Sequence, residues 1–385
     1  MKKVLIYFPE NKLEPKGGPS GYLYELKNGM QCLKDDSIKI SFLPAVPNRI
    51  EDNKVIRDKV PSFFREYRRI IRYSNLHNKK NNNEIIKNYD LIHFHYTEDL
   101  YFNREVLRDY SGKVVLTSHT PCAPFVEKLN RLTERDQRRY PQVTESLKAI
   151  DEYSFNRADY VIFPCPEAEE PYYHTWSEYK DIRSAEKYKY LLTGIAQCSA
   201  NESKEHIRKT YGIPANAFVV CYVGRHNKIK GYETLKEIAK EVIDENTYFL
   251  IAGNETPLKR LNDPHWIEVG WTNDPHSIIN AADVFILPNE ETYFDLIMLE
   301  VLSLGVPIIA SYTGGNKYFM HYNSESICLF KSKREAISII NMFKSNSPEY
   351  LKKLGSINKS IFADDFTNLV FAKKYVNIIK EILNE

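Results

Sequence analysis

The residues best suited to bind a charged ligand follow an apolar run at residues 218–223. Residues 224–231, with the sequence GRHNKIKG, combine two glycines with Arg225 and Lys230. Glycines let backbone N–H groups approach a ligand, and the cations can neutralise a diphosphate, so this pattern is typical of a phosphate site. A solvated basic turn is the alternative, and the position directly after an apolar strand favours binding over it.

A second candidate segment is PNEETYFD at residues 288–295, which leads into an apolar helix at residues 296–304. Its candidate ligand-binding residues are Glu291, Thr292, Asp295 and Leu296. Backbone N–H groups at a helix N-terminus favour a bound anion, although Asp295 could instead serve as an ordinary helix cap. Glu300 lies inside the helix, where a carboxylate is costly unless it is hydrogen-bonded, so we expect it to accept from hydroxyls or backbone amides.

Weaker candidates lie in the first half of the chain. Gly18 is part of GGPSG, a loop before a helix, which could admit a ligand or serve only as a turn. His119 follows the apolar run at residues 113–118, at the carboxyl end of an expected strand, where open sheets bind ligands. His93 and His95 lie on one side of another strand, and with no cysteine or acidic cluster near them we expect a packed or cleft role, not a metal site.

Two series of short apolar runs predict the elements that position these residues. The first series begins at residues 3, 38, 91, 113, 160 and 190, and the second at residues 218, 247, 266, 284, 306 and 326. The runs are rich in β-branched and aromatic residues, which is typical of buried parallel strands. Because helical stretches such as residues 232–243 and 275–282 lie between them, we expect an α/β protein with two doubly wound Rossmann-like domains.

The length of 385 residues, about twice that of a usual single domain, also favours two domains. A small, polar stretch at residues 196–204 predicts a hinge linker, so we expect a first domain of residues 1–195 and a second of residues 196–368. From Val370 to Leu383, apolar residues recur at three-to-four spacing. This final helix, about residues 369–385, should therefore pack back on the first domain.

The composition excludes several classes of protein. Apolar residues make up 43% of the chain and the net charge is +2, so we expect a globular protein without a general attraction for nucleic acid. The longest apolar runs are far shorter than a membrane span, and the N-terminus does not resemble a signal peptide, so we expect a cytoplasmic protein. The six cysteines are scattered, which favours reduced thiols over a disulfide framework.

Several motifs resemble glycosyltransferase family 4, whose members are retaining enzymes with the GT-B fold, in which two Rossmann-like domains face a central cleft. The resemblance rests on VGRHNKIKG, LIAGN, VGWTND, the block at residues 288–311 and TGG, together with GGPSGYLYEL and VVLTSHTP in the first half. It implies that Arg225 and Lys230 hold the diphosphate of a nucleotide sugar and Glu300 its ribose. It further implies that Trp271 and Thr272 lie against the base, that Gly18 lies near the phosphates, and that His119 touches the transferred sugar.

The sequence departs from the family pattern at two positions. The family has two glutamates separated by seven residues, and the first would fall at Thr292; Asp295 stands where the family has glycine. Three accounts remain open. Glu291 takes the missing role, Asp295 contacts the sugar hydroxyls, or the site has lost catalysis.

Residues 54–72 combine seven basic residues with aromatic and aliphatic ones, which predicts an amphipathic helix. Such a helix could lie on an anionic membrane, at its inner face, or could bury its apolar stripe in the protein core.

The resemblance as a whole implies a metal-independent hexosyltransferase without a cofactor that uses a nucleotide diphosphate sugar, UDP-linked by preference, as co-substrate. The acceptor would be a saccharide or a lipid-linked saccharide in surface polysaccharide or glycolipid synthesis. The alternative is a degenerate GT-B scaffold that binds a sugar or a partner enzyme without turnover.

Overall fold

The structure, a computed structural model, describes residues 1–9, 13–15, 18–33, 37–43, 62–81, 83–254 and 257–385. Gly17 and residues 54–61 of the expected amphipathic helix lie outside these ranges. The chain divides into two compact units. Unit 1 comprises Met1–Pro164, Pro171–Leu191 and Ala372–Glu385, and unit 2 comprises Cys165–Glu170 and Leu192–Phe371.

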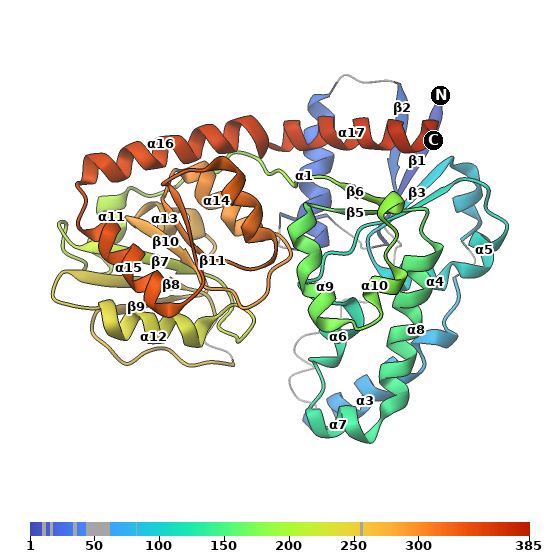
Figure 1. Ribbon diagram of the computed structural model, residues 1–385, viewed down its shortest axis with the longest axis horizontal. Helices are drawn as coiled ribbons and strands as arrows, with labels where there is room; N and C mark the ends of the chain where they lie inside the picture. The colour runs from blue at the N-terminus through green and yellow to red at the C-terminus, as the bar shows by residue number, and fades with distance from the viewer. Residues whose placement is uncertain (10–12, 16–17, 34–36, 44–61, 82, 255–256) are drawn as a thin grey trace. The chain divides into compact units, whose positions relative to one another are not determined.

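Unit 1 contains a parallel sheet of six strands in the order β2-β1-β3-β4-β5-β6 (Figure 1). The strands are β1 (Lys2–Tyr7), β2 (Ile38–Phe42), β3 (Leu91–Phe94), β4 (Lys113–Leu116), β5 (Tyr160–Phe163) and β6 (Tyr188–Tyr190). All residues of β3 and β5 are buried, as expected for central parallel strands that are covered on both faces.

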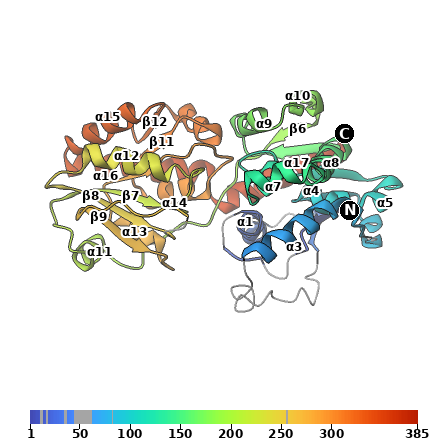
Figure 2. The same cartoon turned by 90° about the horizontal axis from the view of Figure 1, so that it is seen from below.

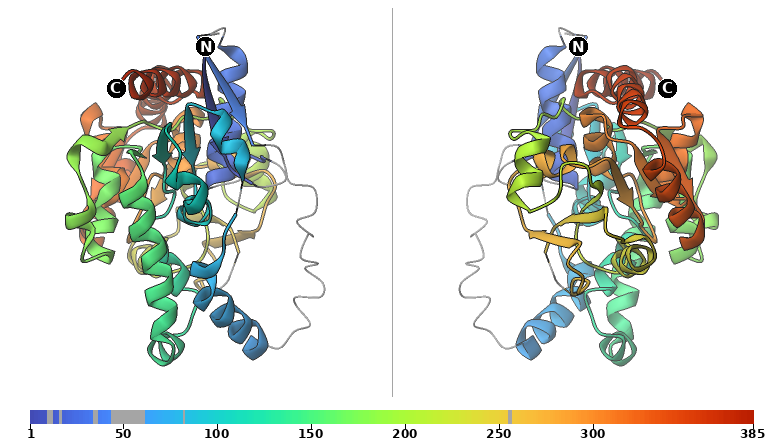
Figure 3. Two further views of the ribbon diagram at one scale, coloured as in Figure 1. Left: turned by 90° about the vertical axis from the view of Figure 1, so that its right-hand side faces the viewer. Right: turned by 90° about the vertical axis from the view of Figure 1, so that its left-hand side faces the viewer.

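The helices of unit 1 connect these strands and cover the sheet. They are α1 (Pro19–Cys32), α3 (Ser62–Ser74), α4 (Thr97–Phe102), α5 (Arg104–Arg108), α6 (Pro124–Leu129), α7 (Glu134–Arg139), α8 (Pro141–Arg157), α9 (Glu170–Thr175) and α10 (Tyr179–Ile182). The 3-10 turns of unit 1 are Leu76–Asn78, Glu84–Asn88 and Ala185–Lys187, whereas the turn Pro166–Glu169 belongs to unit 2. Residues 372–385 of the last helix also belong to unit 1, so both chain termini lie in this unit (Figure 3).

Unit 2 contains a second six-stranded parallel sheet, in the order β12-β11-β10-β7-β8-β9. The strands are β7 (Phe218–Val223), β8 (Thr247–Ala252), β9 (Trp266–Gly270), β10 (Val284–Leu287), β11 (Ile308–Ser311) and β12 (Ile327–Phe330). Numbered from β7, this is the 3-2-1-4-5-6 order of the doubly wound dinucleotide-binding fold.

Helices cover both faces of this second sheet (Figure 2). They are α11 (Lys204–Thr210), α12 (Tyr232–Val242), α13 (Pro275–Asn280), α14 (Leu296–Leu304), α15 (Lys333–Lys344) and α16 (Pro348–Asp365), with a 3-10 helix, η5, at Gly314–Tyr322. The last helix, α17 (Asn368–Asn384), begins in unit 2 and continues in unit 1 from Ala372. On one face, Leu235 and Ile238 of α12 and Ile340 of α15 share a buried core with Val220 of β7 and Ile286 of β10. Burying these side chains fixes the sheet whose strand ends present the candidate ligand-binding loops.

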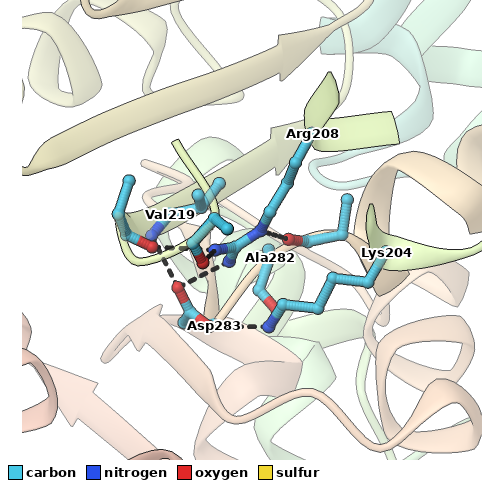
Figure 4. A network of polar contacts seen from close by, with 8 residues as sticks. Lys204, Arg208, Val219, Ala282 and Asp283 are labelled. Atoms are coloured by element: carbon cyan, nitrogen blue, oxygen red, sulfur yellow. Dashed lines mark hydrogen bonds and ion pairs between the residues drawn. The ribbon is translucent and has the colours of Figure 1, made fainter. Parts of the chain in front are cut away.

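An ion pair between a buried arginine and a partly buried aspartate ties α11 to the sheet of unit 2 (Figure 4). The Arg208 guanidinium is 2.8 Å from Asp283 and donates to the carbonyls of Ala281, Ala215 and Ala217. Asp283 also accepts from Lys204 and from the backbone N–H of Val219. Because each group is hydrogen-bonded, the cost of burying the two charges is offset.

The predicted two-domain α/β Rossmann-like fold is confirmed. One strand is misplaced in the prediction, because β6 is Tyr188–Tyr190 whereas the apolar run begins at Tyr190. The partner strand β5 ends at Phe163, opposite Tyr190, so the ladder stops there. The strand expected at residue 306 begins at Ile308, because Pro307 lacks an N–H for the ladder.

Candidate functional site

Two neighbouring strands of unit 2 carry the basic and acidic candidate segments. β7 pairs with β10, and the chain leaves these strands in opposite directions along the sheet. In open α/β sheets this reversal of strand order opens a crevice at the carboxyl ends, where ligands bind. Residues 224–231 follow β7 and residues 288–295 follow β10, so the fold brings both segments to this position.

The two segments are packed together at Gly231. This residue has a φ of 65°, and a Cβ atom added to it would lie 1.7 Å from the carbonyl oxygen of Pro288. The backbone N–H of Glu290 donates to the carbonyl of Ile229 at 2.9 Å. Only glycine satisfies both the left-handed conformation and the close approach, so Gly231 sets the spacing between the segments.

Lys230 and Asp295 form the central ion pair of this site. The Lys230 ammonium is 2.7 Å and 2.6 Å from the two carboxylate oxygens of Asp295, and the side-chain amide of Asn289 donates to the same carboxylate. Burial alone would raise the pKa of Asp295, but Lys230, Asn289 and Thr292 together lower it below its usual value. Asp295 is therefore ionised and forms an ion pair with the candidate phosphate-binding residue Lys230.

Asp295 is not an ordinary helix cap. It occupies the N-cap position of α14, yet its side chain makes no capping hydrogen bond. Asp295 thus has the expected N-cap position, but its carboxylate contacts Lys230 and not a backbone N–H of α14.

The other candidate residues of these two segments are close to Lys230 or Asp295 in the sequence. Arg225 is exposed, and its carbonyl oxygen accepts from the Tyr222 hydroxyl at 2.9 Å. Thr292 is fully buried, whereas Glu291 and Leu296 are partly buried. Leu296 is the first residue of α14.

The loop after β11 supports the acidic segment from the other side. Ser311 donates to the carbonyl of Asn289 at 2.6 Å, and Thr313 donates to that of Glu290 at 3.1 Å. A Cβ atom at Gly315 would lie 2.1 Å from the carbonyl oxygen of Tyr293. The TGG motif thus holds the segment before α14 in place.

Glu300 has a different partner from the one expected. Its carboxylate is 3.3 Å from Nε2 of His276, and 26% of its side chain is exposed, so it lies at the edge of the apolar helix. Contacts with Cys198 and with Glu300 raise the pKa of His276 to about 10, so the imidazole is protonated at neutral pH. Glu300 is thus held by a cation, not by the expected hydroxyls or backbone amides.

Trp271 and Thr272 follow β9, which is the edge strand of the sheet. Trp271 is 67% exposed, which is unusual for so large an apolar side chain. The Thr272 hydroxyl accepts from the backbone N–H of Asp274, and Asp274 caps α13. The structure therefore places both residues at the carboxyl edge of the sheet, two strands away from β7.

In unit 1, His119 lies beside a second switch point, between β1 and β3. Its Nε2 is 2.9 Å from Nδ1 of His95, which follows β3, and its ring contacts the edge of Tyr22 with a centroid distance of 4.8 Å. Tyr22 belongs to α1, which begins after Gly18; Gly18 has a φ of 78°, and no atom lies within 4 Å of a Cβ added there.

The expectation that His93 and His95 lie on one side of their strand is confirmed, because their rings are 4.2 Å apart. His93 is hydrogen-bonded to the hydroxyls of Tyr375 and Thr117. Burial lowers the pKa of His93 and of His119 to about 3, and it lowers the pKa of His95 well below its usual value. All three imidazoles are therefore neutral at physiological pH.

Sequence reasoning missed two residues of these sites, Asn289 and His276, which contact Asp295 and Glu300. It named His95, which contacts His119, but did not predict this contact. The position of His95 two residues beyond His93, at a strand end, was the only usable signal. Asn289 and His276 acquire their roles through contacts that strand pattern does not encode.

Among the described residues, no cluster of three or more His, Cys, Asp or Glu side chains is arranged to hold a metal ion. No helix in the described part of the chain combines the length and apolarity needed to cross a bilayer.

Comparison with known proteins identifies a matching family model and several relatives. Residues 217–341 match the family Glycosyl transferases group 1. The chain is 25% identical over 212 residues to the O-antigen biosynthesis glycosyltransferase WclY of Escherichia coli, a match that covers 52% of this chain and 57% of the relative. It is 30% identical over 122 residues to the lipopolysaccharide core biosynthesis glycosyltransferase LpsD of Rhizobium meliloti, covering 30% and 35% of the two chains. The matches thus span 57% of the length of the first relative and 35% of the length of the second.

Solved structures resemble the whole chain. Sucrose-phosphate synthase of Thermosynechococcus elongatus superposes with a TM-score of 0.65 at 18% identity and covers 100% of both chains. Anabaena HepE in complex with UDP-glucose gives a TM-score of 0.65 at 15% identity and covers 99% of this chain and 100% of its own. These likenesses confirm the GT-B fold, and with the sequence matches they confirm a relationship to GT-B glycosyltransferases. Membership of family 4 and retention of configuration stay predictions.

Proposed function

We propose that the protein is a retaining glycosyltransferase that moves a sugar from a nucleotide diphosphate sugar to an acceptor hydroxyl. The observation that carries this proposal is the meeting of Lys230, the Asp295 end of α14 and the 224–231 loop at the switch point of unit 2. A cation and a helix N-terminus directed at one place favour a diphosphate. The relatives named for O-antigen and lipopolysaccharide core synthesis support an acceptor in a surface polysaccharide or glycolipid.

The proposed chemistry depends on stabilising the departing nucleotide diphosphate. Arg225 and Lys230 would offset the negative charge that grows on the leaving oxygen, which is the type of electrostatic stabilisation that dominates many group transfers. Glu300 would accept hydrogen bonds from the ribose, and the exposed Trp271 would offer a stacking surface to the base. We propose UDP as the nucleotide, supported by the structural likeness to a protein solved with UDP-glucose.

A donor panel tests this proposal. The full chain is incubated with UDP-, GDP-, ADP- and CDP-sugars, and released nucleotide is measured with and without saccharide acceptors. We expect release from one donor, with a rate that falls by at least about 100-fold in Arg225→Ala, because a lost leaving-group contact costs several kcal/mol. Turnover in Arg225→Ala equal to that of the wild type contradicts the assignment.

A non-catalytic scaffold is the second candidate function, and one feature favours it. Lys230 is already paired with the protein's own carboxylate, and Thr292 stands where the family has glutamate. A scaffold predicts no nucleotide release from any donor, together with retained binding of a saccharide or a partner protein. Binding measured by calorimetry alongside the donor panel separates the two functions.

We also propose that α3 contacts an anionic membrane surface. Ile70 and Tyr73 are buried and anchor the helix, whereas Phe64, Tyr67 and Ile71 are 56%, 48% and 46% exposed. A core-facing stripe explains the buried pair but not the exposed apolar residues, which share the helix surface with exposed arginines. Arginine side chains near a negatively charged lipid surface add about 1 kcal/mol each to binding.

Co-sedimentation with vesicles containing anionic phospholipid tests this contact. The variant changes three exposed arginines of α3 to glutamate: Arg65, Arg68 and Arg72. The matched control changes three exposed arginines of α7 to glutamate, namely Arg135, Arg138 and Arg139, so the change in total charge is the same. Helix α7 presents no exposed large apolar residue. We expect the α3 variant to lose pelleting and the α7 variant to keep most of it. Equal pelleting of both variants excludes α3 as the docking element.

A further inference from the structure

The imidazoles of His95 and His119 share one hydrogen bond, and this couples their tautomers. Nδ1 of His95 and Nε2 of His119 are 2.9 Å apart, and their rings are nearly parallel, with an interplanar angle of 23°. A neutral imidazole carries its proton on only one of its two nitrogens. If His95 donates from Nδ1, then His119 must accept at Nε2 and carry its own proton on Nδ1. If His119 donates from Nε2, then His95 must carry its proton on Nε2.

The environment of His95 distinguishes between these two states. His95 is 1% exposed, and its Nε2 atom is buried without a hydrogen-bond partner in the described structure. A buried N–H without an acceptor costs about 1–3 kcal/mol, and such orphaned donors are rarer than unpaired acceptors. The state with a proton on Nε2 of His95 is therefore disfavoured, and both histidines should carry their protons on Nδ1.

The groups around His95 keep the pair in its neutral form. The rings of His93 and Tyr22 have centroids 4.2 Å and 5.7 Å from that of His95, and His119 completes the contacts. Burial lowers the pKa of each histidine and raises that of Tyr22, so these neighbours are uncharged at neutral pH. None of them supplies a negative charge that would stabilise an imidazolium.

We propose that His95 is a positioning residue that fixes His119 as the Nδ1–H tautomer, so that His119 presents a hydrogen-bond donor and not a general base to its ligand. The link to the reaction rests on the proposed function, in which His119 contacts the transferred sugar. An Nδ1–H group can donate to a sugar oxygen, whereas it cannot remove a proton from a hydroxyl. The assignment of the tautomer itself depends only on the contacts of His95.

Nitrogen NMR of the full chain labelled with 15N-histidine tests the tautomer directly. The chemical shifts of protonated and bare imidazole nitrogens differ. The chain has ten histidines, and the signals of His119 are those that disappear in His119→Gln. We expect a protonated Nδ1 and a bare Nε2 in His119 from pH 6 to 8. A protonated Nε2, or an even mixture of tautomers, overturns the proposal. This measurement needs no substrate, so its outcome is independent of whether the protein is a transferase.

Substitution of His95 tests the positioning role. His95→Phe keeps the ring volume and removes the hydrogen bond, so we expect mixed His119 signals and a fall in kcat of up to about 100-fold, because small misplacements of a reacting group have effects of this size. The KM for the nucleotide sugar should change little, since on the proposed function the donor diphosphate binds to unit 2. His95→Asn keeps a donor near the position of Nδ1 and should restore the tautomer and most of the rate.

Tyr375→Phe is the matched control, because it removes a buried hydrogen bond from the neighbouring His93 and leaves the His95 to His119 bond intact. We expect unchanged His119 signals in this variant. An identical spectral change in Tyr375→Phe and His95→Phe would show that general packing, and not the hydrogen bond, sets the tautomer. If His95→Phe does not fold, the wild-type spectrum and His95→Asn still decide the question.

Discussion

Replacing Asp295 with asparagine should strengthen the binding of nucleoside diphosphates. Lys230 is bound to both oxygens of Asp295, at 2.7 Å and 2.6 Å. A phosphate that reaches Lys230 must share the ammonium with this carboxylate, and two anions on one ammonium lie about 4–5 Å apart. The asparagine variant keeps the size of the side chain and removes its charge.

The magnitude follows from Coulomb's law. Two unit charges about 5 Å apart repel each other by about 3 kcal/mol at an effective dielectric constant near 20, and solvent at this partly exposed site reduces that figure. Loss of the pair also leaves Lys230 without its anionic partner in the free protein, which acts in the same direction. We therefore expect the Kd for a nucleoside diphosphate to fall by about 10- to 100-fold, since about 1.4 kcal/mol corresponds to a factor of ten.

Isothermal titration with UDP, GDP, ADP and CDP measures this effect. The matched control is Glu290→Gln, which neutralises an exposed acid of the same segment and should change the Kd by less than about 3-fold, because exposed charges are screened. If Asp295 also binds sugar hydroxyls, then Asp295→Asn should bind nucleotide more tightly and transfer sugar more slowly. Weaker or unchanged nucleotide binding in Asp295→Asn refutes the idea that the phosphate and Asp295 share Lys230.

Three further predictions concern the scaffold of the two sites. Arg208→Met should lower the free energy of unfolding by about 1–3 kcal/mol in urea titrations, because the partly buried Asp283 loses its guanidinium partner and keeps only Lys204; a stability equal to that of the wild type would contradict this. Gly231→Ala should abolish nucleotide binding while unit 2 stays folded, since an added Cβ would lie 1.7 Å from the carbonyl oxygen of Pro288 and push the two segments apart. Calorimetry and circular dichroism on the same sample test this. His93 has a pKa lowered to about 3, so the unfolded state binds more protons between that pH and about 6.5, and stability should fall as the pH drops through this window. At pH 5 the loss should be about 2 kcal/mol for this histidine, and urea titrations at pH 7 and 5 should show a smaller loss in His93→Gln.

The fold could be predicted because its signal is local and repeated. Runs such as FVVCYV are apolar at every position, which in a short segment indicates a strand covered on both faces, and β7 forms there. The glycine and lysine of the 224–231 segment could be identified for a similar reason, since the pattern of a strand followed by a phosphate loop is contiguous. The end of β6 at Tyr190 could not be predicted, because it depends on where its neighbour β5 ends.

The partners of the site residues depend on contacts between distant segments. Asp295 resembles a helix cap when only its neighbours in sequence are considered, but β7 lies next to β10 and so Lys230 reaches its carboxylate from 65 residues away. Glu300 resembles a buried carboxylate in need of hydroxyls, but α13 brings His276 to it. Such pairs follow from the strand order, and strand order is not encoded in any single apolar run.

The two switch points present different chemistry, and this difference bears on what each can bind. Unit 1 brings neutral groups to its switch point, namely the imidazoles of His95 and His119 and the ring of Tyr22. Unit 2 brings ionised groups to its own, namely Lys230 and Asp295. Neutral donors and acceptors suit the hydroxyls of a sugar, since a buried charge there would need a counter-charge that a sugar does not supply. Ionised groups suit a diphosphate, provided that the protein's own anion gives way. On the proposed function, a diphosphate that binds at this switch point must therefore compete with Asp295 for Lys230.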